Sequence, residues 1–166
     1  MSVIVSDGIT LEDLRPGDEP VLFELYAAVR SEELGMQDWP EEMRNRVLRT
    51  QFDAQRRGYR DQFPNLDEQL ILCDGSPVGW VVVDRSGSRE LHGIDIALLA
   101  GARQRGVGTR VMRSLQEEAA ASNRPMMIVV ERRNARAVAF HRRLGFLATD
   151  DTEVHSLMEW RQHNQP

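Results

Sequence analysis

The sequence predicts an α/β fold of the α+β type, in which a sheet of about six to seven strands is flanked by about four helices. Two observations carry this prediction. Three apolar runs rich in β-branched residues follow one another from Leu70 and are separated by the turn-forming clusters "DGSP" and "RSGS". On either side of that block, apolar residues recur at helical spacing.

The N-terminal third begins with a short strand, "TLEDLRPGDEP", that ends in a turn. A first helix follows with Asp18 as its cap, and its apolar positions are Leu22, Leu25, Tyr26 and Val29. A second helix begins in "DWPEEMRNRV", where Asp38 and Glu41 have the spacing of a capping box, and it is predicted to end near Gly58. A polar stripe on this second helix could line a pocket or face solvent, and it consists of Gln51, Gln55 and Tyr59.

The second half of the chain alternates strands and helices. The three apolar runs indicate consecutive antiparallel strands, and a glycine-rich stretch, a helix to about Ala121 and the stop signal Pro125 follow them. The run "MMIVV" indicates a buried strand, residues 134–144 a helix closed by Gly145, and "EVHSLMEW" a last strand. The predicted order of elements is therefore βααβββαβαββ.

Length and composition favour a single globular domain over residues 1–166, since 41% of the residues are hydrophobic and 28% are charged. The N-terminus lacks the features of a signal peptide, and we expect a cytoplasmic protein with no membrane partner. The net charge of -5 argues against non-specific binding of nucleic acid. The single cysteine, Cys73, excludes an intrachain disulfide and a cysteine-type metal site, so we expect a buried structural thiol and no metal.

The glycine-rich stretch "RQRGVGTRVM", residues 103–112, predicts a phosphate-binding turn. A strand that runs through glycines into a helix presents free backbone N–H groups at the positive end of the helix dipole. Thr109 and Arg110 follow the last glycine, so the Lys-Ser/Thr of an NTPase loop is missing. Val111 stands where a dinucleotide fingerprint needs a third Gly or Ala. A purely structural tight turn remains the alternative for such a pair of glycines.

Two motifs in sequence order give this stretch a context. The first is Arg/Gln-x-x-Gly-x-Gly/Ala, matched between the strand "IDIALL" and the following helix by Arg103, Gly106 and Gly108. The second comes from "NARAVAFHRRLGF", with Asn134, Ala137, Phe140 and the Leu-Gly-Phe of residues 144–146. With both motifs, the chain resembles the GNAT superfamily of acetyl-CoA-dependent N-acetyltransferases over roughly residues 68–160. The resemblance implies the GNAT fold: a mixed central sheet, antiparallel in its N-terminal part, with a splayed strand pair that forms the acyl-CoA cleft.

The resemblance also implies a coenzyme A site. In the family, backbone N–H groups of the glycine loop hold the pyrophosphate, and the matching positions are Arg103, Gln104, Arg105, Gly106, Val107, Gly108 and Thr109. The pantetheine arm pairs with strand backbone in the gap, where the matching positions are Ile96, Ala97 and Leu98, with Val129 and Val130 opposite. Further positions beside the coenzyme are Asn134, Ala137 and Phe140. Arginines that could reach its phosphates, or could simply be solvated, are Arg105, Arg110, Arg142 and Arg143.

The implied chemistry is direct attack of an amine on the thioester of acetyl-CoA, without an acyl-enzyme on Cys73. A backbone N–H near Leu98 could polarise the thioester carbonyl. The family commonly has a Tyr seven residues after the motif Asn, which donates a proton or hydrogen bond to sulfur. Here that position is His141, which can also donate, although it could equally be a satisfied helix-face histidine.

Three residues are candidates for the base that deprotonates the amine. Asp95 interrupts the apolar pattern of its strand, and alternation places it on the face opposite Ile94 and Ile96. Glu131 closes the strand "MMIVVE" near the gap, and His92 lies near the position that some family members give to a glutamate base. Each could instead be a polar residue exposed at a strand end or edge.

The sequence thus predicts an acetyltransferase that moves an acetyl group from acetyl-CoA to a primary amine, in a small molecule or a peptide. Acetyl-CoA is the cosubstrate, and no nucleic acid or membrane partner is expected. Homodimers are frequent in the family that the chain resembles. The alternative is a non-catalytic acyl-CoA-binding or sensing module, which keeps the glycine loop without an acid and a base.

Overall fold

The computed structural model of the protein describes residues 1–162. One sheet of eight strands runs through this part of the chain in the order β1-β2-β3-β4-β5-β6-β8-β7. The strands are β1 (Ser2–Ser6), β2 (Ile9–Asp13), β3 (Leu66–Cys73), β4 (Ser76–Asp84), β5 (Leu91–Leu98), β6 (Met126–Glu131), β7 (Leu147–Asp151) and β8 (His155–Trp160). The α-helices are α1 (Glu19–Glu33), α2 (Glu41–Gln62), α3 (Val107–Ala121) and α4 (Ala135–Arg143).

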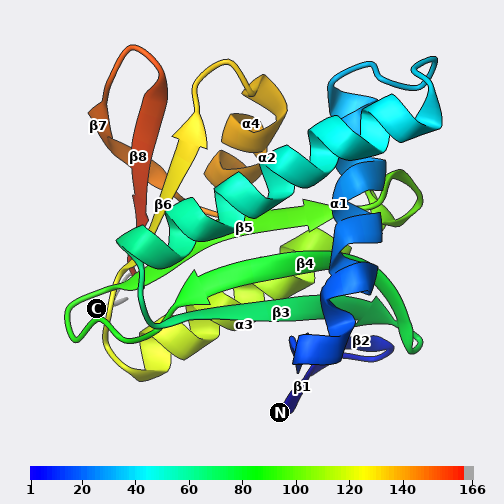
Figure 1. Ribbon diagram of the computed structural model, residues 1–166. Coiled ribbons are helices and arrows are strands. Elements are labelled where there is room, and N and C mark those ends of the chain that lie inside the picture. Colours follow the sequence, from blue (N-terminus) through cyan, green and yellow to red (C-terminus); the bar gives the residue numbers. More distant parts are fainter. Residues whose placement is uncertain (163–166) are drawn as a thin grey trace.

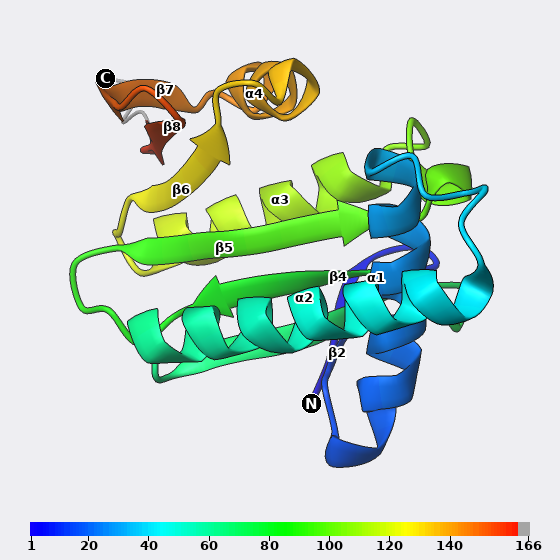
Figure 2. The same ribbon diagram turned by 45° about the horizontal axis from the view of Figure 1, so that its top comes forward.

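The helices cover both faces of this sheet. Figure 2 shows α1 and α2 in front of β3, β4 and β5, with α3 behind them and α4 beside β6. The α1–α2 layer closes a core around Phe52 and Trp80, and the α3–α4 layer closes a larger core around Ile71, Leu115 and Phe146. No helix within residues 1–162 combines the length and the apolar character that a membrane crossing requires.

The single parallel strand pair in the described sheet is β5–β6, and it is short. Its paired residues are Leu91 with Met126, His92 with Met127 and Gly93 with Ile128. Beyond these pairs the two strands diverge, as the arrows of β5 and β6 show in Figure 1. The β4–β5 register shifts at the same point, because Val82 pairs with Asp95 and Val83 with Gly93. Ile94 is therefore the extra residue of a β-bulge, which bends β5 where it leaves β6.

The predicted order of elements is confirmed from β2 onward, with one strand more than expected. The additional strand β1 is an exposed edge strand that pairs with β2 across a tight turn at Gly8 (φ +75°). Two local predictions for the second helix were wrong. The helix continues past Gly58 to Gln62, because a glycine inside a helix costs only about 1 kcal/mol and does not by itself end it. Its N-cap is Pro40, with no capping bond from Asp38.

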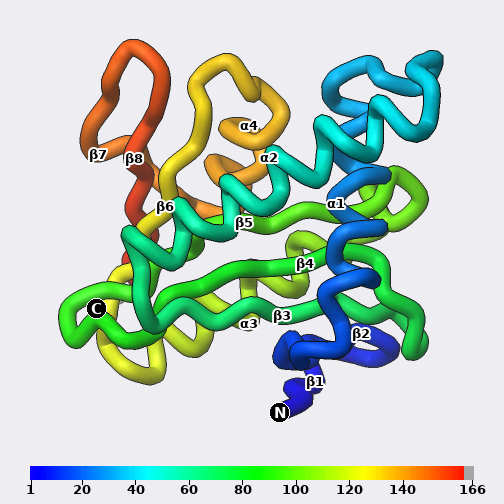
Figure 3. The backbone as a smooth tube through the Cα atoms, viewed as in Figure 1, coloured from blue at the N-terminus to red at the C-terminus, as the bar shows by residue number. Residues whose placement is uncertain are grey.

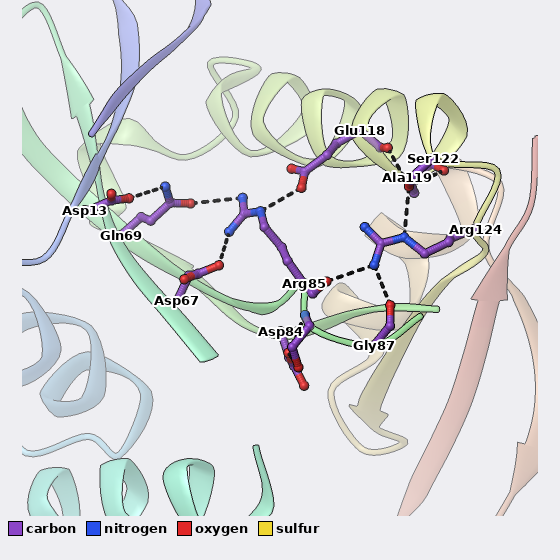
Figure 4. A network of polar contacts seen from close by, with 11 residues as sticks. Asp13, Asp67, Gln69, Asp84, Arg85, Gly87, Glu118, Ala119, Ser122 and Arg124 are labelled. Atoms are coloured by element: carbon purple, nitrogen blue, oxygen red, sulfur yellow. Dashed lines mark hydrogen bonds and ion pairs between the residues drawn. The ribbon is translucent and has the colours of Figure 1, made fainter. Parts of the chain in front are cut away.

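A polar network fixes the end of the sheet at which β5 and β6 pair (Figure 4). Arg85 follows β4, and its guanidinium donates to Glu118 of α3 (2.8 Å), to Asp67 (3.0 Å) and to Gln69 of β3 (3.2 Å). Gln69 donates in turn to Asp13 of β2 over 2.9 Å. These bonds tie the C-terminal part of α3 to three strands, so the helix holds its place while its N-terminus meets the diverging end of β5.

Candidate active site

The gap between β5 and β6 exposes backbone hydrogen-bonding groups of β5. The N–H of Leu99 donates to the carbonyl of Val78 next to β4 over 2.8 Å. Since successive residues of an antiparallel strand turn their N–H and C=O groups to opposite sides, those of Leu98 and Ile96 point away from β4, into the gap. This end of β5 therefore offers an edge to which an extended amide-bearing chain can pair.

The glycine turn lies immediately after this edge. Gln104 (φ +59°) and Gly106 (φ +78°) adopt left-handed backbone conformations, and α3 begins at Val107. The backbone N–H groups of residues 104–109 donate to no acceptor in the described chain. A Cβ on Gly106 would meet open space, apart from Arg110 Cζ at 4.0 Å. These free donors at a helix N-terminus, approached without side-chain hindrance, fit a pyrophosphate.

Gly108 brings the two sequence motifs together. A Cβ at this position would lie 3.4 Å from Cζ of Phe140 on α4 and 3.5 Å from Cδ1 of Leu98 on β5. The turn, the strand edge and α4 therefore meet at one point. On α4, Asn134 is the N-cap, and its Oδ1 accepts a hydrogen bond from the N–H of Ala137 over 3.0 Å.

The side chains of the glycine stretch have different surroundings. Arg103 bonds inward, to the carbonyl oxygen of Leu98 (2.9 Å) and to Glu32 at the end of α1 (3.0 Å). Figure 3 shows the turn that carries Arg103 running beside that end of α1. Val107 is buried in the core, and the exposed side chains of the turn are those of Gln104, Arg105 and Arg110. Arg143 is exposed at the end of α4.

His141 is buried on α4 between two aromatic rings. Its ring centroid lies 5.0 Å from that of Phe140 and 5.5 Å from that of Phe146, both in edge-on contact. Burial lowers the pKa of His141 from 6.5 to about 4, so the imidazole is neutral at pH 7. Its Nδ1 is buried and has no hydrogen-bond partner within residues 1–162. A buried polar atom without a partner is costly, which is typical of a functional position.

Asp95 faces the α1–α2 layer. Oδ2 of Asp95 accepts a hydrogen bond from Trp80 Nε1 over 2.9 Å, and burial raises the pKa of the carboxyl. The prediction that Asp95 lies opposite Ile96 is confirmed, because Ile96 packs into the α3 core. The same prediction for Ile94 was wrong, since the bulge turns that side chain toward the α1–α2 core.

A pocket extends from Asp95 beneath α1 and α2, and most of its walls are apolar or aromatic. Three of its lining residues were singled out from the sequence, namely Gln55 and Tyr59 of the polar stripe and the candidate base Asp95. Sequence reasoning missed the walls that other elements supply, among them Leu22, Tyr26, Phe52 and Val82. The sequence marks these residues only as apolar positions on the buried faces of α1, α2 and β4. That pattern predicts core packing and does not predict a pocket.

The other candidates do not line this pocket. Gln51 is an exposed residue one turn before Gln55 on α2. Glu131 is exposed at the end of β6, where its carbonyl oxygen accepts from the N–H of Asn134 over 3.0 Å. His92 lies in the paired part of β5 and contacts Glu90 over 2.9 Å. Of the three candidate bases, Asp95 is the one that lines this pocket.

The family follows from a comparison with family models. The model described as "Acetyltransferase (GNAT) family" matches residues 24–146, and the chain therefore belongs to this family. Family membership supports acetyl transfer in general. No curated protein matches the chain.

Solved structures agree on the fold. PaiA N-acetyltransferase from Thermoplasma acidophilum, in complex with coenzyme A, is 13% identical with a TM-score of 0.70, over 92% of this chain and 98% of that one. RimL, a ribosomal L7/L12 alpha-N-protein acetyltransferase, is 16% identical with a TM-score of 0.71, over 97% and 94% of the chains. An acetyltransferase from Thermus thermophilus is 19% identical with a TM-score of 0.68, over 97% and 99%. At these identities the likeness concerns the fold alone.

Proposed function

We propose that this chain transfers an acetyl group from acetyl-CoA to a primary amine by direct attack in a ternary complex. The observation that carries the proposal is the divergence of β5 from β6 beside a glycine turn whose N–H groups are free. That arrangement offers a strand edge for the amide-bearing arm of the coenzyme and a helix N-terminus for its pyrophosphate. The coenzyme A complex of PaiA, which has the same fold, is consistent with this assignment.

The donor site uses backbone groups more than side chains. The free N–H groups from Gln104 to Thr109 receive the pyrophosphate, since that of Arg103 already donates to the carbonyl oxygen of Ala100. Ile96 and Leu98, whose N–H groups point into the gap, pair with the pantetheine arm, while Ala97 between them pairs with Trp80 of β4. Phe140 and Ala137 contact the arm from α4, with Asn134 at the helix start and the exposed Arg143 within reach of phosphate. Acetyl-CoA supplies an activated acetyl thioester there.

The acceptor amine first loses a proton to Asp95, directly or through water. Its nitrogen lone pair then forms a C–N bond with the thioester carbon, whose oxygen is held by the N–H of Leu98. As the C–S bond breaks, the nitrogen gives up its second proton. The thiolate sulfur accepts a hydrogen bond from the neutral imidazole of His141 and takes up one of the two released protons, so it leaves as a thiol. The products are an acetamide, free coenzyme A and one proton released to solvent.

Asp95 is favoured as the base over Glu131 because it lies on β5, the strand that borders the gap, and also lines the pocket beneath α2. Burial raises its pKa, which makes the carboxylate a stronger base. Glu131 remains the second candidate, since it ends β6 on the opposite side of the gap.

The first test is calorimetric titration of the protein with acetyl-CoA, coenzyme A and ATP. We expect binding of acetyl-CoA and coenzyme A, and none of ATP, because the strand edge recognises the pantetheine arm that ATP lacks. A folded sample that binds neither thioester nor thiol would overturn the proposal. Binding without release of coenzyme A in the presence of any primary amine would favour the non-catalytic acyl-CoA-binding module.

Direct attack also predicts that no acetyl group stays on the enzyme. All 21 basic side chains are arginines, so no lysine can be acetylated as a background reaction. After incubation with acetyl-CoA, the intact mass should be unchanged. An added acetyl mass that is lost in Cys73→Ala would instead indicate an acyl-enzyme.

A further inference from the structure

We propose that the pocket at Asp95 receives the ammonium group of an amine carried on an unbranched carbon. The acceptors are then unbranched primary alkylamines, the ε-amine of lysine derivatives among them, rather than α-amines of amino acids or peptide N-termini. This inference rests on the proposed function and names its substrate class. It is carried by the charge, the walls and the size of the pocket.

The charge of the pocket is that of one unpaired carboxylate. Asp95 forms no ion pair with an arginine or a histidine among residues 1–162, and the groups that hydrogen-bond to its carboxylate are neutral, namely the indole of Trp80 (2.9 Å) and the hydroxyl of Tyr59. The other acidic group of the pocket, Glu68, is already paired with Arg56 over 2.5 Å. Arg30, whose positive charge favours the ionised form of Asp95, is itself paired with Glu33 over 2.8 Å. A cation is therefore the ligand that completes the charge balance at Asp95.

The walls beside this carboxylate are aromatic. The ring of Tyr26 lies 6.1 Å from that of Trp80 and 5.2 Å from that of Phe52, measured between centroids. Tyr59 lines the same pocket from α2. Aromatic rings attract a cation through their quadrupoles and exclude water, which strengthens the attraction to Asp95. An ammonium group on an apolar chain fits such walls, while an anionic substituent next to the amine would be repelled by Asp95.

The size of the pocket decides between branched and unbranched amines. The space in it that can hold a water-sized group is about 20 Å³. About one water-sized group fills a space of that order, and an ammonium group has that size. An amine on a branched carbon carries two further heavy-atom substituents beside the nitrogen. In an α-amino acid or a peptide N-terminus these are a side chain and a carbonyl carbon, which exceed a space of that size.

Two pairs of isomers test the inference. The first pair is n-butylamine and sec-butylamine, which have the same formula and differ in branching at the carbon that bears nitrogen. The second pair is Nα-acetyllysine, with a free ε-amine, and Nε-acetyllysine, with a free α-amine beside a carboxylate. We expect kcat/KM, measured as release of coenzyme A from acetyl-CoA, to favour the unbranched member of each pair by about tenfold or more. Equal values within a pair would overturn the inference.

Two variants on α2 make the test specific to the pocket. Tyr59→Ala removes one wall, and the preference for n-butylamine should fall by at least about threefold as the space widens. Gln51→Ala changes an exposed residue of the same stripe that does not line the pocket, and the preference should stay as in the unchanged protein. An unaltered preference in Tyr59→Ala would contradict the assignment of the pocket.

A readout without turnover separates this inference from the proposed function. In the presence of coenzyme A, n-butylamine should raise the melting temperature more than sec-butylamine does, and Asp95→Asn should abolish the difference. A difference in melting temperature without any acetylated product would leave the pocket assignment standing and overturn the transfer reaction. Product formation from both isomers, without a preference in either readout, would overturn the pocket assignment alone.

Discussion

The side chain of Arg103 donates a hydrogen bond from Nε to the carbonyl oxygen of Leu98 over 2.9 Å. This bond joins the first residue of the glycine turn to the end of β5. There, the N–H of Leu98 is the group that we propose holds the thioester oxygen. Because the same guanidinium also bonds Glu32, it connects the proposed donor site to α1, which supplies a wall of the pocket at Asp95. We therefore expect Arg103 to position the backbone rather than to bind phosphate.

Replacement of Arg103 tests this positioning. We expect Arg103→Leu to weaken acetyl-CoA binding by about tenfold, since a hydrogen bond from a charged group typically contributes about 1.5–3 kcal/mol. Arg105→Leu removes an exposed arginine of the same turn and should change the dissociation constant by less than about threefold. Calorimetry of both variants checks this, and a larger loss in Arg105→Leu would show that direct charge attraction matters more than position.

The two motif glycines should differ in their tolerance of a methyl group. Gly106→Ala puts a Cβ on a residue with φ +78°, which costs about 1–2 kcal/mol of folding stability, and places that Cβ among the free N–H groups. Gly108 has no left-handed conformation, and a Cβ there would make ordinary contacts with Phe140 and Leu98. We expect urea unfolding and acetyl-CoA titration to show clear losses in Gly106→Ala and near-normal values in Gly108→Ala. The reverse order would mean that the turn does not hold pyrophosphate.

Much of the fold could be predicted from the sequence because its signals are local. Apolar alternation, helical spacing and turn residues placed β2 to β6, β8 and all four α-helices in order, while β7 was counted in that order without a residue range. The edge strand β1 was missed although "SVIVSDG" carries a signal, namely β-branched residues before an Asp-Gly turn. The misplaced face of Ile94 has a different cause. A bulge inserts one residue into the alternation, and only the pairing of Val82 with Asp95 and Val83 with Gly93 reveals it.

The site was predictable to the extent that it is built from one stretch of backbone. The glycine turn follows β5 directly in the sequence, so one motif and its spacing predicted both the turn and the strand that borders the gap. The pocket at Asp95 draws on α1, α2, β3, β4 and β5, and its members are spread from Leu14 to Asp95. Apolar periodicity assigns such residues to a core, and only the packed structure shows which of them leave a space beside a carboxylate.

The role of Asp95 predicts a pH dependence. Burial raises the pKa of its carboxyl, so the base form is lost as pH falls through that raised value, and kcat/KM should fall on the acid side. Asp95→Asn should lower kcat/KM by about 10²–10⁴-fold and remove the acid limb that Asp95 contributes to the pH profile. A carboxyl whose pKa is raised in the folded state stabilises the fold less as pH rises through that pKa. Asp95→Asn, which replaces the carboxyl with an amide of the same shape, should therefore not lower the free energy of unfolding at pH 8. A destabilised variant with an unchanged profile would make Asp95 a structural partner of Trp80.

His141 predicts a pH dependence of stability instead. Its pKa is about 4 in the folded protein, against 6.5 for a histidine in water, so the unfolded chain binds a proton more readily. The contribution of neutral His141 is fully present above pH 6.5 and is lost as pH falls toward 4, by up to about 1.4 kcal/mol per pH unit. His141→Phe should reduce the loss of unfolding free energy between pH 7.5 and pH 5, measured by urea denaturation. His155→Phe, at an exposed position, should keep the loss, and equal slopes in both variants would contradict the assignment.

The network around Arg85 predicts that stability and donor binding can be separated. Arg85→Ala removes the hydrogen bonds to Glu118, Asp67 and Gln69, and we expect a loss of about 1–3 kcal/mol in the free energy of unfolding. Acetyl-CoA affinity should change by less than about threefold, because the network holds the end of α3 opposite to its binding N-terminus. Arg89→Ala, an exposed arginine with no ion pair among the described residues, should leave both quantities unchanged. If Arg85→Ala weakened acetyl-CoA binding as strongly as Arg103→Leu does, α3 would have to shift as a rigid body when its far end is released, and the glycine turn would depend on that distant anchor.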